Sequence, residues 1–541
     1  MAIDISGWET RLTDEMVARF SASGAWRNLT IADRLKDWAS RTPDEIAIVD
    51  GDTSLTYAEF YRRSLRLATM FVRQGLHPGD VVSFQLPNWH EAMIINAAAA
   101  MAGLVVNPIV PIYRDAEVGF ILKDAKARVL FIPETLRSTD YVELIERLRP
   151  QLPSLERVVL VRALRDGYDA FDEWMTSEEP GTFDLPAVDP NAVKLVLYTS
   201  GTTGVPKGVL HSHNTLGAEI DAFVHHRSLT SADVVFMPSP VTHIAGYLYG
   251  MELLLACGMK TIYMERWNAV EAVDLIARHE ASFTAAATPF LAELVMELER
   301  RGVKLPSMRF FGCGGAPVSP DIVGRAREVM PNCETTRAYG ATEAPTISYG
   351  VVPGDPMDLA AITDGSIVNH EVRIVDIASG KHLAPEQEGE IVTRGPEVML
   401  GYASPAATAE AFDEEGFFHT GDLGFISHGN YVTVTGRIKD IIIRGGENIA
   451  PKEIEDVLHR HPAVREASVV AMPHERLGET PCAFIVLNDG VALEFEEMIS
   501  FLEQHKVAKQ KFPEKLVIAG ELPHNAAGKV LKHILKAQLK D

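Results

Sequence analysis

One loop in this chain of 541 residues combines glycines, hydroxyl side chains and a lysine in a way that suits binding of a highly charged ligand. It runs from Tyr198 to Gly208 and reads Tyr-Thr-Ser-Gly-Thr-Thr-Gly-Val-Pro-Lys-Gly. Its glycines lack a Cβ, so the backbone can bring several N–H donors close to an anion. The hydroxyls add further donors, and Lys207 adds a positive charge. This composition favours a polyphosphate.

A glycine-rich loop by itself is often only a flexible surface turn. Here it directly follows the apolar run 194–197, which predicts a buried strand and favours a binding site at the strand end. The spacing matches neither the Walker loop nor the dinucleotide pattern G-x-G-x-x-G.

Four later stretches also combine glycine with charged or hydroxyl side chains: 339–343 (Tyr-Gly-Ala-Thr-Glu), 420–422 (Thr-Gly-Asp), 436–440 (Gly-Arg-Ile-Lys-Asp) and 525–529 (Asn-Ala-Ala-Gly-Lys). Together with the loop at 198–208, they resemble in order the motifs of the adenylate-forming superfamily. This superfamily includes acyl-CoA synthetases, aryl-acid ligases, peptide-synthetase adenylation domains and luciferase. The chain is most similar to acyl-CoA synthetases of the cyclohexanecarboxylate or medium-chain acid type.

Joining a carboxylate to a thiol is uphill in free energy, so the acid first needs a good leaving group. The resemblance implies that the acid attacks the α-phosphate of ATP, releases pyrophosphate and forms an acyl-adenylate. Coenzyme A then takes the acyl group and AMP leaves. The expected co-substrates and cofactor are therefore ATP, coenzyme A and Mg²⁺, and the protein needs mainly to stabilise phosphoryl charge and align its reactants.

The resemblance assigns the phosphates of ATP to the glycine-rich loop. The loop residues expected to contact the nucleotide are Thr199, Ser200, Gly201, Thr202, Thr203, Gly204 and Lys207. Thr342 resembles the contact to the α-phosphate, and Glu343 resembles the magnesium ligand. A single glutamate suffices because Mg²⁺ takes one or two carboxylates together with phosphate oxygens and waters.

Asp422 is expected to hold the ribose, since an ionised carboxylate offers acceptors to both hydroxyls. Arg437 follows closely and is expected to reach the ribose or a phosphate. Tyr339 is expected to stack on adenine. The small residues that would let the base approach the backbone are Gly314, Gly315, Ala316, Gly340 and Ala341.

Lys529 matches the catalytic lysine of the superfamily, which would bridge the substrate carboxylate and the α-phosphate. Lys439 resembles the hinge about which a C-terminal lid rotates after adenylation. That rotation would bring Gly445 and Gly446 to the site, where they would line a tunnel for the pantetheine arm.

The basic residues Lys509 and Lys511 are expected to contact the phosphates of coenzyme A. A solvated basic patch is an equally weighted interpretation of these two lysines.

Acid specificity is expected around His243, which matches the gating aromatic or histidine position. The apolar residues predicted to line the acid pocket are Val241, Ile244, Ala245, Ala286 and Ala287. The region lacks the Asp of amino-acid-activating relatives and the Asn-Tyr pair common in dihydroxybenzoate ligases. It therefore predicts an acid without polar substituents, with cyclohexanecarboxylate or a medium-chain fatty acid favoured.

Two alternatives stay open at this point. An aryl-acid ligase would deliver its adenylate to a carrier-protein thiol, and the N-terminal stretch 7–35 resembles such enzymes. A non-catalytic nucleotide sensor could share the fold, although the joint presence of Glu343, Asp422 and Lys529 disfavours it.

The order of apolar patterns predicts an α/β fold, because short apolar strands alternate with amphipathic helices. We expect a large N-terminal body, 1–438, built from two layered α/β subdomains, the second beginning near Asp189. A small β-barrel-like subdomain is expected from Glu371 to Thr435. A small, mobile α+β lid is expected at 439–541, and a surface connection at 164–190.

Composition limits location and partners. The formal charge of −23 argues against a nucleic-acid-binding surface, and four scattered cysteines without ligand spacing suit the cytoplasm. No signal peptide is visible. The uncharged run from Ala92 to Ile112 is long enough to span a bilayer, but Asn, Gly and Pro interrupt it. It predicts a buried helix to about Ala102 and then a strand, not a transmembrane segment. A homodimer is among the oligomeric states left open.

Overall fold

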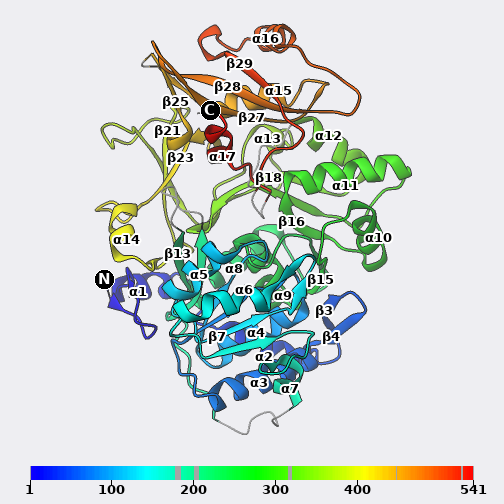
Figure 1. The fold of residues 1–541 in the computed structure, drawn as a ribbon, viewed down its shortest axis with the longest axis vertical. Helices are drawn as coiled ribbons and strands as arrows, with labels where there is room; N and C mark the ends of the chain where they lie inside the picture. The colour runs from blue at the N-terminus through cyan, green and yellow to red at the C-terminus, as the bar shows by residue number, and fades with distance from the viewer. Residues whose placement is uncertain are drawn as a thin grey trace.

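The computed structural model describes residues 2–176, 184–199, 206–314, 320–445, 447–524 and 528–539. Two eight-stranded sheets, with helices packed around them, form the N-terminal body, and the C-terminal residues form a separate domain above it (Figure 1). The predicted layered α/β architecture is confirmed.

The first sheet is parallel over six strands and antiparallel at its last two pairings. Its strands, in spatial order, are β11 (Asp169–Ala170), β10 (Arg157–Leu160), β7 (Val129–Ile132), β5 (Val81–Phe84), β6 (Val105–Pro108), β12 (Val193–Thr199), β13 (Lys207–Ser212) and β22 (Gly401–Tyr402). Associated helices are α5 (Asp115–Asp124), α6 (Tyr141–Leu148), α7 (Phe171–Thr176) and α8 (His213–Arg227). Helix α3 (Tyr57–Arg73) contacts the second sheet, which is described next.

The second sheet is parallel at its centre and ends in one hairpin on each side. Its strands, in spatial order, are β19 (Ala344–Tyr349), β18 (Glu334–Ala341), β17 (Phe310–Gly314), β16 (Phe283–Ala287), β14 (Val234–Met237), β15 (Lys260–Tyr263), β3 (Ile46–Asp50) and β4 (Thr53–Thr56). Associated helices are α2 (Ile31–Arg41), α10 (Ala269–His279), α11 (Thr288–Arg301) and α12 (Pro320–Val329).

The two subdomains are interleaved along the chain. β3 and β4 come from the N-terminal part but lie in the second sheet, whereas β12 and β13 follow Asp189 and lie in the first. The expectation that the second winding begins near Asp189 is therefore wrong. Sequence alternation reveals strands but not which sheet each one joins.

Helix α4 (His90–Met101) is buried along its whole length. It contacts β6 of the first sheet, β3 of the second, and both α2 and α3. The predicted helix and following strand within the run 92–112 are thus confirmed, and enclosure by protein on all sides explains the missing polar face. In the parts of the chain that the structure describes, no helix is long and apolar enough to cross a membrane.

The region after residue 370 differs from the expected barrel. It forms an open four-stranded antiparallel sheet, whose outer strands do not pair with each other in the described chain. Its strands are β20 (Glu371–Val375), β21 (Gly389–Arg394), β23 (Phe418–Ser427) and β24 (Tyr431–Arg437). Four strands are too few to close a barrel around a side-chain core.

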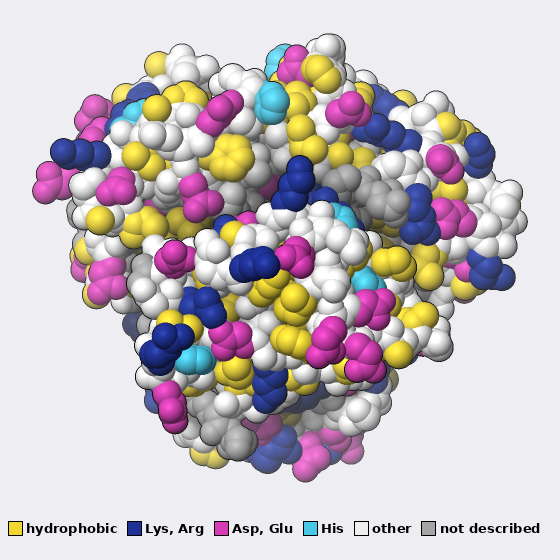
Figure 2. Space-filling model, turned by 90° about the horizontal axis from the view of Figure 1, so that it is seen from above, with side chains coloured by type: hydrophobic (Ala, Val, Ile, Leu, Met, Phe, Trp, Pro, Cys, Tyr) yellow, Lys and Arg dark blue, Asp and Glu magenta, His cyan; other side chains and the backbone are white. Residues whose placement is uncertain are grey.

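The C-terminal domain follows the short 3₁₀ turn η3 (Ile438–Asp440), in which the predicted boundary falls. Its five-stranded sheet consists of β25 (Ile442–Arg444), β26 (Glu447–Ile449), β27 (Val464–His474), β28 (Gly478–Leu487) and β29 (Lys515–Ile518). Its helices are α15 (Pro451–Leu458), α16 (Phe495–Gln504) and α17 (Lys532–Ala537). On the face seen from above, Lys and Arg side chains are interspersed with Asp and Glu (Figure 2).

Candidate active site

The glycine-rich loop connects two antiparallel strands. Thr199 ends β12 and pairs with Lys207 at the start of β13, so the two residues that flank the loop lie opposite each other. A side chain at Gly208 would be crowded, because a Cβ would lie 3.0 Å from the Tyr198 ring and 3.2 Å from the Ala403 side chain. The predicted contacts Ser200, Gly201, Thr202, Thr203 and Gly204 lie outside the described residues.

A second hairpin presents Thr342 and Glu343. Strands β18 and β19 pair up to Ala341 and Ala344, which leaves these two residues as the turn. A register shift precedes the turn at Gly340, where any Cβ would overlap the Pro345 carbonyl oxygen. The backbone of the turn is fixed by two bonds: the Met399 N–H donates to the Glu343 carbonyl at 2.8 Å, and His211 Nε2 lies 2.8 Å from the Thr342 carbonyl.

The Glu343 carboxylate faces the glycine-rich hairpin. The Tyr402 hydroxyl donates to Glu343 Oε1 at 2.8 Å, and Lys207 Nζ lies 5.0 Å from the centre of the Tyr402 ring. Burial raises the pKa of Glu343 despite the bond from Tyr402. A nearby cation would offset the cost of this ionised carboxylate, so the residues present fit a divalent metal held together with phosphates.

Asp422 lies within β23 of the four-stranded sheet. It is a cross-strand partner of Arg437, whose Nε lies 2.8 Å from Asp422 Oδ1. The Tyr339 hydroxyl donates to Asp422 Oδ2 at 3.0 Å, which links the second sheet to β23. Three residues predicted to contact the nucleotide are thus joined directly, although Tyr339 is buried.

Lys529 approaches this group from the C-terminal domain. Its side chain is solvent-exposed, yet loss of hydration near the body and the charge of Arg437 lower the pKa of Lys529 to about 8, opposed by Asp422. A Cβ on the preceding Gly528 would lie 3.5 Å from that of Ala287, so this segment reaches the end of β16. The domain is therefore turned with Lys529 toward the body.

His243 is also within electrostatic range of Lys529. Burial, assisted by the charge of Lys529, lowers the pKa of His243 to about 4, so its imidazole is neutral. Val241 and Ile244 are buried in the same apolar cluster as Ala285, and Ala245 packs against that cluster. These residues form an apolar region beside the lysine.

Ala286 corrects the predicted acid pocket. It packs in a different cluster with Leu291 and Cys313, because successive side chains on β16 point to opposite faces of the sheet. Ala285 replaces it on the face of Val241 and Ile244. The prediction placed the neighbouring residues Ala286 and Ala287 in one pocket, although neighbouring side chains of a strand point to opposite faces.

The residues expected to serve coenzyme A lie apart from this group. Gly445 has φ +60°, and its N–H donates to the Leu477 carbonyl at 2.8 Å. Gly446 lies outside the described residues, and so do Gly315 and Ala316 of the predicted nucleotide site. Lys509 and Lys511 pair with Glu503 at 3.0 Å and Glu453 at 2.5 Å. Lys439 is exposed within η3. Gly314 ends β17, beside the Ala338 carbonyl.

Sequence reasoning missed two features of the site. Tyr402 has no motif of its own, yet it bonds Glu343. The segment after Ala245 forms a π-helix, η2 (Gly246–Glu252), and continues as α9 (Leu253–Cys257). π-helical turns are frequent at functional sites, and propensity does not predict them.

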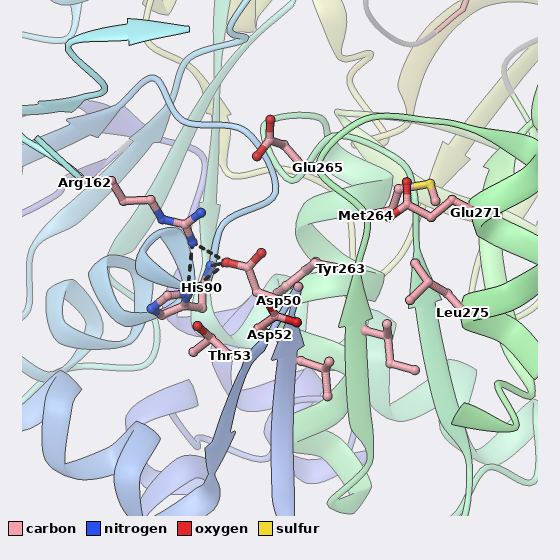
Figure 3. A pocket seen from close by; sticks show the side chains of 13 residues that line it. Asp50, Asp52, Thr53, His90, Arg162, Tyr263, Met264, Glu265, Glu271 and Leu275 are labelled. Carbon is pink, nitrogen blue, oxygen red and sulfur yellow. Dashed lines mark hydrogen bonds and ion pairs between the residues drawn. The ribbon is translucent and has the colours of Figure 1, made fainter. Parts of the chain in front are cut away.

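A separate group of charges, termed the Asp50 cluster, consists of Asp50, His90, Glu91 and Arg162. It borders a cavity of about 370 Å³ (Figure 3). Three of its residues place ligand atoms within 4.8 Å of one another, as a metal site would. However, the Arg162 guanidinium bonds Asp50 and donates to both Glu91 oxygens at 2.8 and 2.9 Å.

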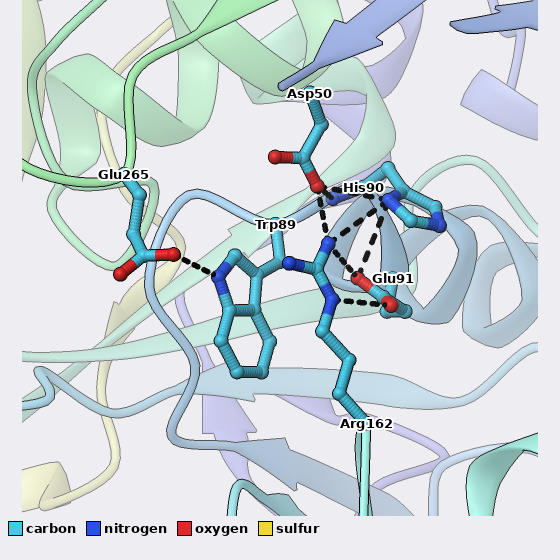
Figure 4. A network of polar contacts seen from close by, with 6 residues as sticks. All are labelled: Asp50, Trp89, His90, Glu91, Arg162 and Glu265. Carbon is cyan, nitrogen blue, oxygen red and sulfur yellow. Dashed lines mark hydrogen bonds and ion pairs between the residues drawn. The ribbon is translucent and has the colours of Figure 1, made fainter. Parts of the chain in front are cut away.

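Arg162 also stacks on Trp89, with its Cζ 4.2 Å from the ring centre (Figure 4). The Asp50 carboxylate accepts the backbone N–H of His90 at 3.0 Å, at the start of α4. The cluster thus joins β3, α4 and the segment after β10, and its cation is the arginine itself.

Comparison with known proteins supports the geometry. The profile of the AMP-binding enzyme family matches residues 35–403, and that of the AMP-binding enzyme C-terminal domain matches residues 453–529. The medium-chain fatty-acid–CoA ligase of Escherichia coli (strain K12) is 35% identical over 96% of this chain and 92% of its own length. A salicylyl-CoA synthase / salicylate adenylyltransferase of a Streptomyces species is 29% identical over 96% of both chains.

Among solved structures, ATP-bound MatB from Rhodopseudomonas palustris superposes with a TM-score of 0.86 at 27% identity, over 95% of this chain and 99% of MatB. The apo form of the same protein gives 0.75 at 28% identity over the same shares. The arrangement of the described residues is therefore nearer to the ATP-bound form, in agreement with the position of Lys529.

Proposed function

The chain belongs to the family of AMP-binding enzymes, and from that premise we propose that this acyl-CoA ligase activates an apolar carboxylic acid, with a medium-chain fatty acid or cyclohexanecarboxylate favoured. One observation carries the proposal: Lys529 lies within electrostatic range both of the Asp422–Arg437 pair and of His243 in the apolar region. A lysine in that position can contact both an acid carboxylate and a nucleotide phosphate.

Adenylation brings two anions together, so its barrier is largely electrostatic. Lys529 would supply a positive charge between them, and loss of hydration together with the charge of Arg437 lowers its pKa to about 8. Asp422 would hold the ribose and Thr342 the α-phosphate. Tyr339 would then flank the adenine, with Lys207 and the hairpin of Thr199 holding the remaining phosphates.

Glu343 would bind Mg²⁺ together with phosphate oxygens, which accords with its raised pKa. When bound, the ion neutralises phosphate charge and orients the nucleotide. Tyr402 holds the carboxylate in place, and the turn of β18 and β19 fixes its backbone.

The acid would lie against Val241, Ile244, Ala245, Ala285 and Ala287, which offer it no charged partner. The Escherichia coli relative is named for medium-chain fatty acids, which supports this choice. The Streptomyces relative is named for salicylate, so an aryl acid is the second candidate, with a carrier-protein thiol as the alternative acceptor.

The thioester step would require the C-terminal domain to rotate about Lys439. Gly445 and Gly446 would then approach the adenylate. Lys509 and Lys511 would exchange their partners Glu503 and Glu453 for phosphates of coenzyme A. Cytoplasmic location and a homodimeric state remain predictions.

The test is CoA-dependent AMP release across a panel of hexanoate, octanoate, cyclohexanecarboxylate, benzoate, 2,3-dihydroxybenzoate, salicylate, palmitate and acetate. The highest kcat/KM is expected at octanoate, hexanoate or cyclohexanecarboxylate. A maximum at a hydroxylated aryl acid, with no turnover of coenzyme A, would instead support the carrier-protein ligase. Absence of ATP–pyrophosphate exchange with every acid would overturn the enzymatic function.

A further inference from the structure

Two carboxyl groups meet in the interior of the body, away from any motif. Glu219 lies on α8 and Glu397 lies in the loop between β21 and β22, and both are fully buried. Their side chains are within hydrogen-bonding reach of each other. Two carboxylates cannot share a hydrogen bond unless one of them carries a proton, so the pair holds one proton and one negative charge.

Each carboxyl group also has partners from other elements. The Tyr249 and Tyr349 hydroxyls each donate to Glu219 at 2.7 Å. Glu397 accepts the Asn369 amide at 2.5 Å, and the Nε2 of His370 lies 2.8 Å from its other oxygen. His370 is buried and neutral, since burial lowers its pKa to about 4. The pair therefore joins α8, the π-helix η2, β19 and two loops.

Two short paths lead from this pair to Glu343. On one side, the Tyr249 hydroxyl lies 2.6 Å from Thr346 Oγ1, three residues beyond Glu343 on β19. On the other side, the loop of Glu397 continues to Met399, whose N–H bonds the Glu343 carbonyl, and to Tyr402, whose hydroxyl bonds its carboxylate. Both the backbone and the side chain of Glu343 are thus held by segments anchored at the pair.

We propose that Glu219 and Glu397 are positioning residues that share one proton and hold Glu343 in the geometry needed for the metal–nucleotide complex. The inference rests on the proposed role of Glu343 as a magnesium ligand. Burial raises the pKa of Glu397 to about 7 and that of Glu219 well above its usual range, in agreement with one proton per pair at neutral pH.

The shared proton predicts a non-additive double mutant. In Glu219→Gln or Glu397→Gln, an amide N–H replaces the shared O–H and the other residue keeps the charge. The double variant has no anion, and its two amides bring four N–H donors to a site that already holds two tyrosines and Asn369.

Urea unfolding without ligands tests this prediction. Each single Gln variant should raise the unfolding equilibrium constant less than about threefold. The double variant should raise this constant at least about tenfold more than the product of the two single-variant factors. An additive result would overturn proton sharing.

The positioning role is tested by the Mg²⁺ concentration that gives half-maximal ATP–pyrophosphate exchange. In Glu397→Ala it should rise about tenfold with an unchanged KM for the acid, while Glu397→Gln should restore the wild-type value. The matched control is Lys194→Met with Glu252→Gln, an equally buried ion pair that joins β12 to η2. It should lower stability without moving the Mg²⁺ midpoint.

The variant Glu343→Gln distinguishes the proposed metal role of Glu343 from the proposed positioning role of the Glu219–Glu397 pair. If this variant leaves the Mg²⁺ midpoint unchanged, the proposed metal role of Glu343 is wrong. If Glu343→Gln moves the midpoint but folded Glu397→Ala does not, the metal role stands and the positioning role of the pair is wrong.

Discussion

The Asp50 cluster and the group around Lys529 both contain acidic and basic side chains, but they differ in whether the protein stabilises the charged forms. In the Asp50 cluster, burial of Asp50 acts against ionisation, yet bonds from His90 and Arg162 outweigh it and lower the pKa of Asp50. Each charged group there finds its partner within the protein. Such a cluster stabilises the fold.

Around Lys529, the protein instead disfavours the charged forms of Glu343 and of Lys529 itself. Glu343 has a raised pKa and Lys529 a lowered one, so each would gain from an oppositely charged ligand. A metal bound to a polyphosphate offers a cation to the first and an anion to the second. The difference teaches that incompletely compensated charge, more than the presence of charge, distinguishes a binding site from a structural cluster.

The largest expected effect is at Lys529. Lys529→Ala should lower the rate of ATP–pyrophosphate exchange by about 10²–10³-fold, because no other group supplies its charge between the two anions. Thioester formation from a supplied acyl-adenylate should be nearly unchanged. Equal loss of both half-reactions would mean that the lysine acts on folding or domain position and that the contrast with the Asp50 cluster fails.

A smaller effect is expected at Asp422. Asp422→Asn keeps the shape but removes the charge that orders Arg437 and would accept the ribose hydroxyls. The Kd for ATP, measured by calorimetry, should rise about tenfold, as expected for loss of a charged hydrogen bond. An unchanged Kd would show that the ribose is held elsewhere.

The Asp50 cluster should respond in stability alone. Arg162→Met should lower the free energy of unfolding by about 1–2 kcal/mol, a discounted value because 36% of the arginine side chain is exposed. The rate per folded molecule should not change. Arg41→Ala, which removes an exposed pair with Asp37, is the control and should have little effect in the same urea titration. Loss of activity in folded Arg162→Met would give this cluster a functional role.

The mildest test is pH. Lys529 must be protonated to offset phosphate charge, and its pKa is about 8, so kcat/KM for ATP should be level near pH 7 and fall as pH rises through 8. In Lys529→Arg, which stays charged, the fall should disappear even if the absolute rate is lower. A fall at the same pH in both enzymes would assign the titration to another group.

Local patterns predicted the elements of the site well. The motifs mark turns and strands around Thr342, Glu343 and Asp422, which nearby residues such as Gly340 determine, whereas the roles of these residues and of Lys529 stay predictions. They did not reveal Tyr402 or the Glu219–Glu397 pair, whose partners are distant in sequence. The prediction for Ala286 is wrong because the apolar run 285–287 contains no polar residue to mark which of the two faces lines the pocket.

The assignment of strands to sheets was also hard to predict, because it depends on contacts between residues distant in sequence. Strand alternation predicted two layered subdomains but not that β3 joins strands made two hundred residues later. The π-helix η2 was also invisible, because its geometry depends on burial of Tyr247, Tyr249 and Glu252 among other elements.

The interleaving of the two sheets has a consequence for synthesis on the ribosome. β3 has only its hairpin partner β4 until β15 has emerged, and α4 has no second sheet to pack against before then. Such long-range pairing slows folding and leaves apolar surface exposed on the growing chain. The first 260 residues should therefore be the interval in which a nascent chain depends most on chaperones, and they should not yield a stable fragment by truncation.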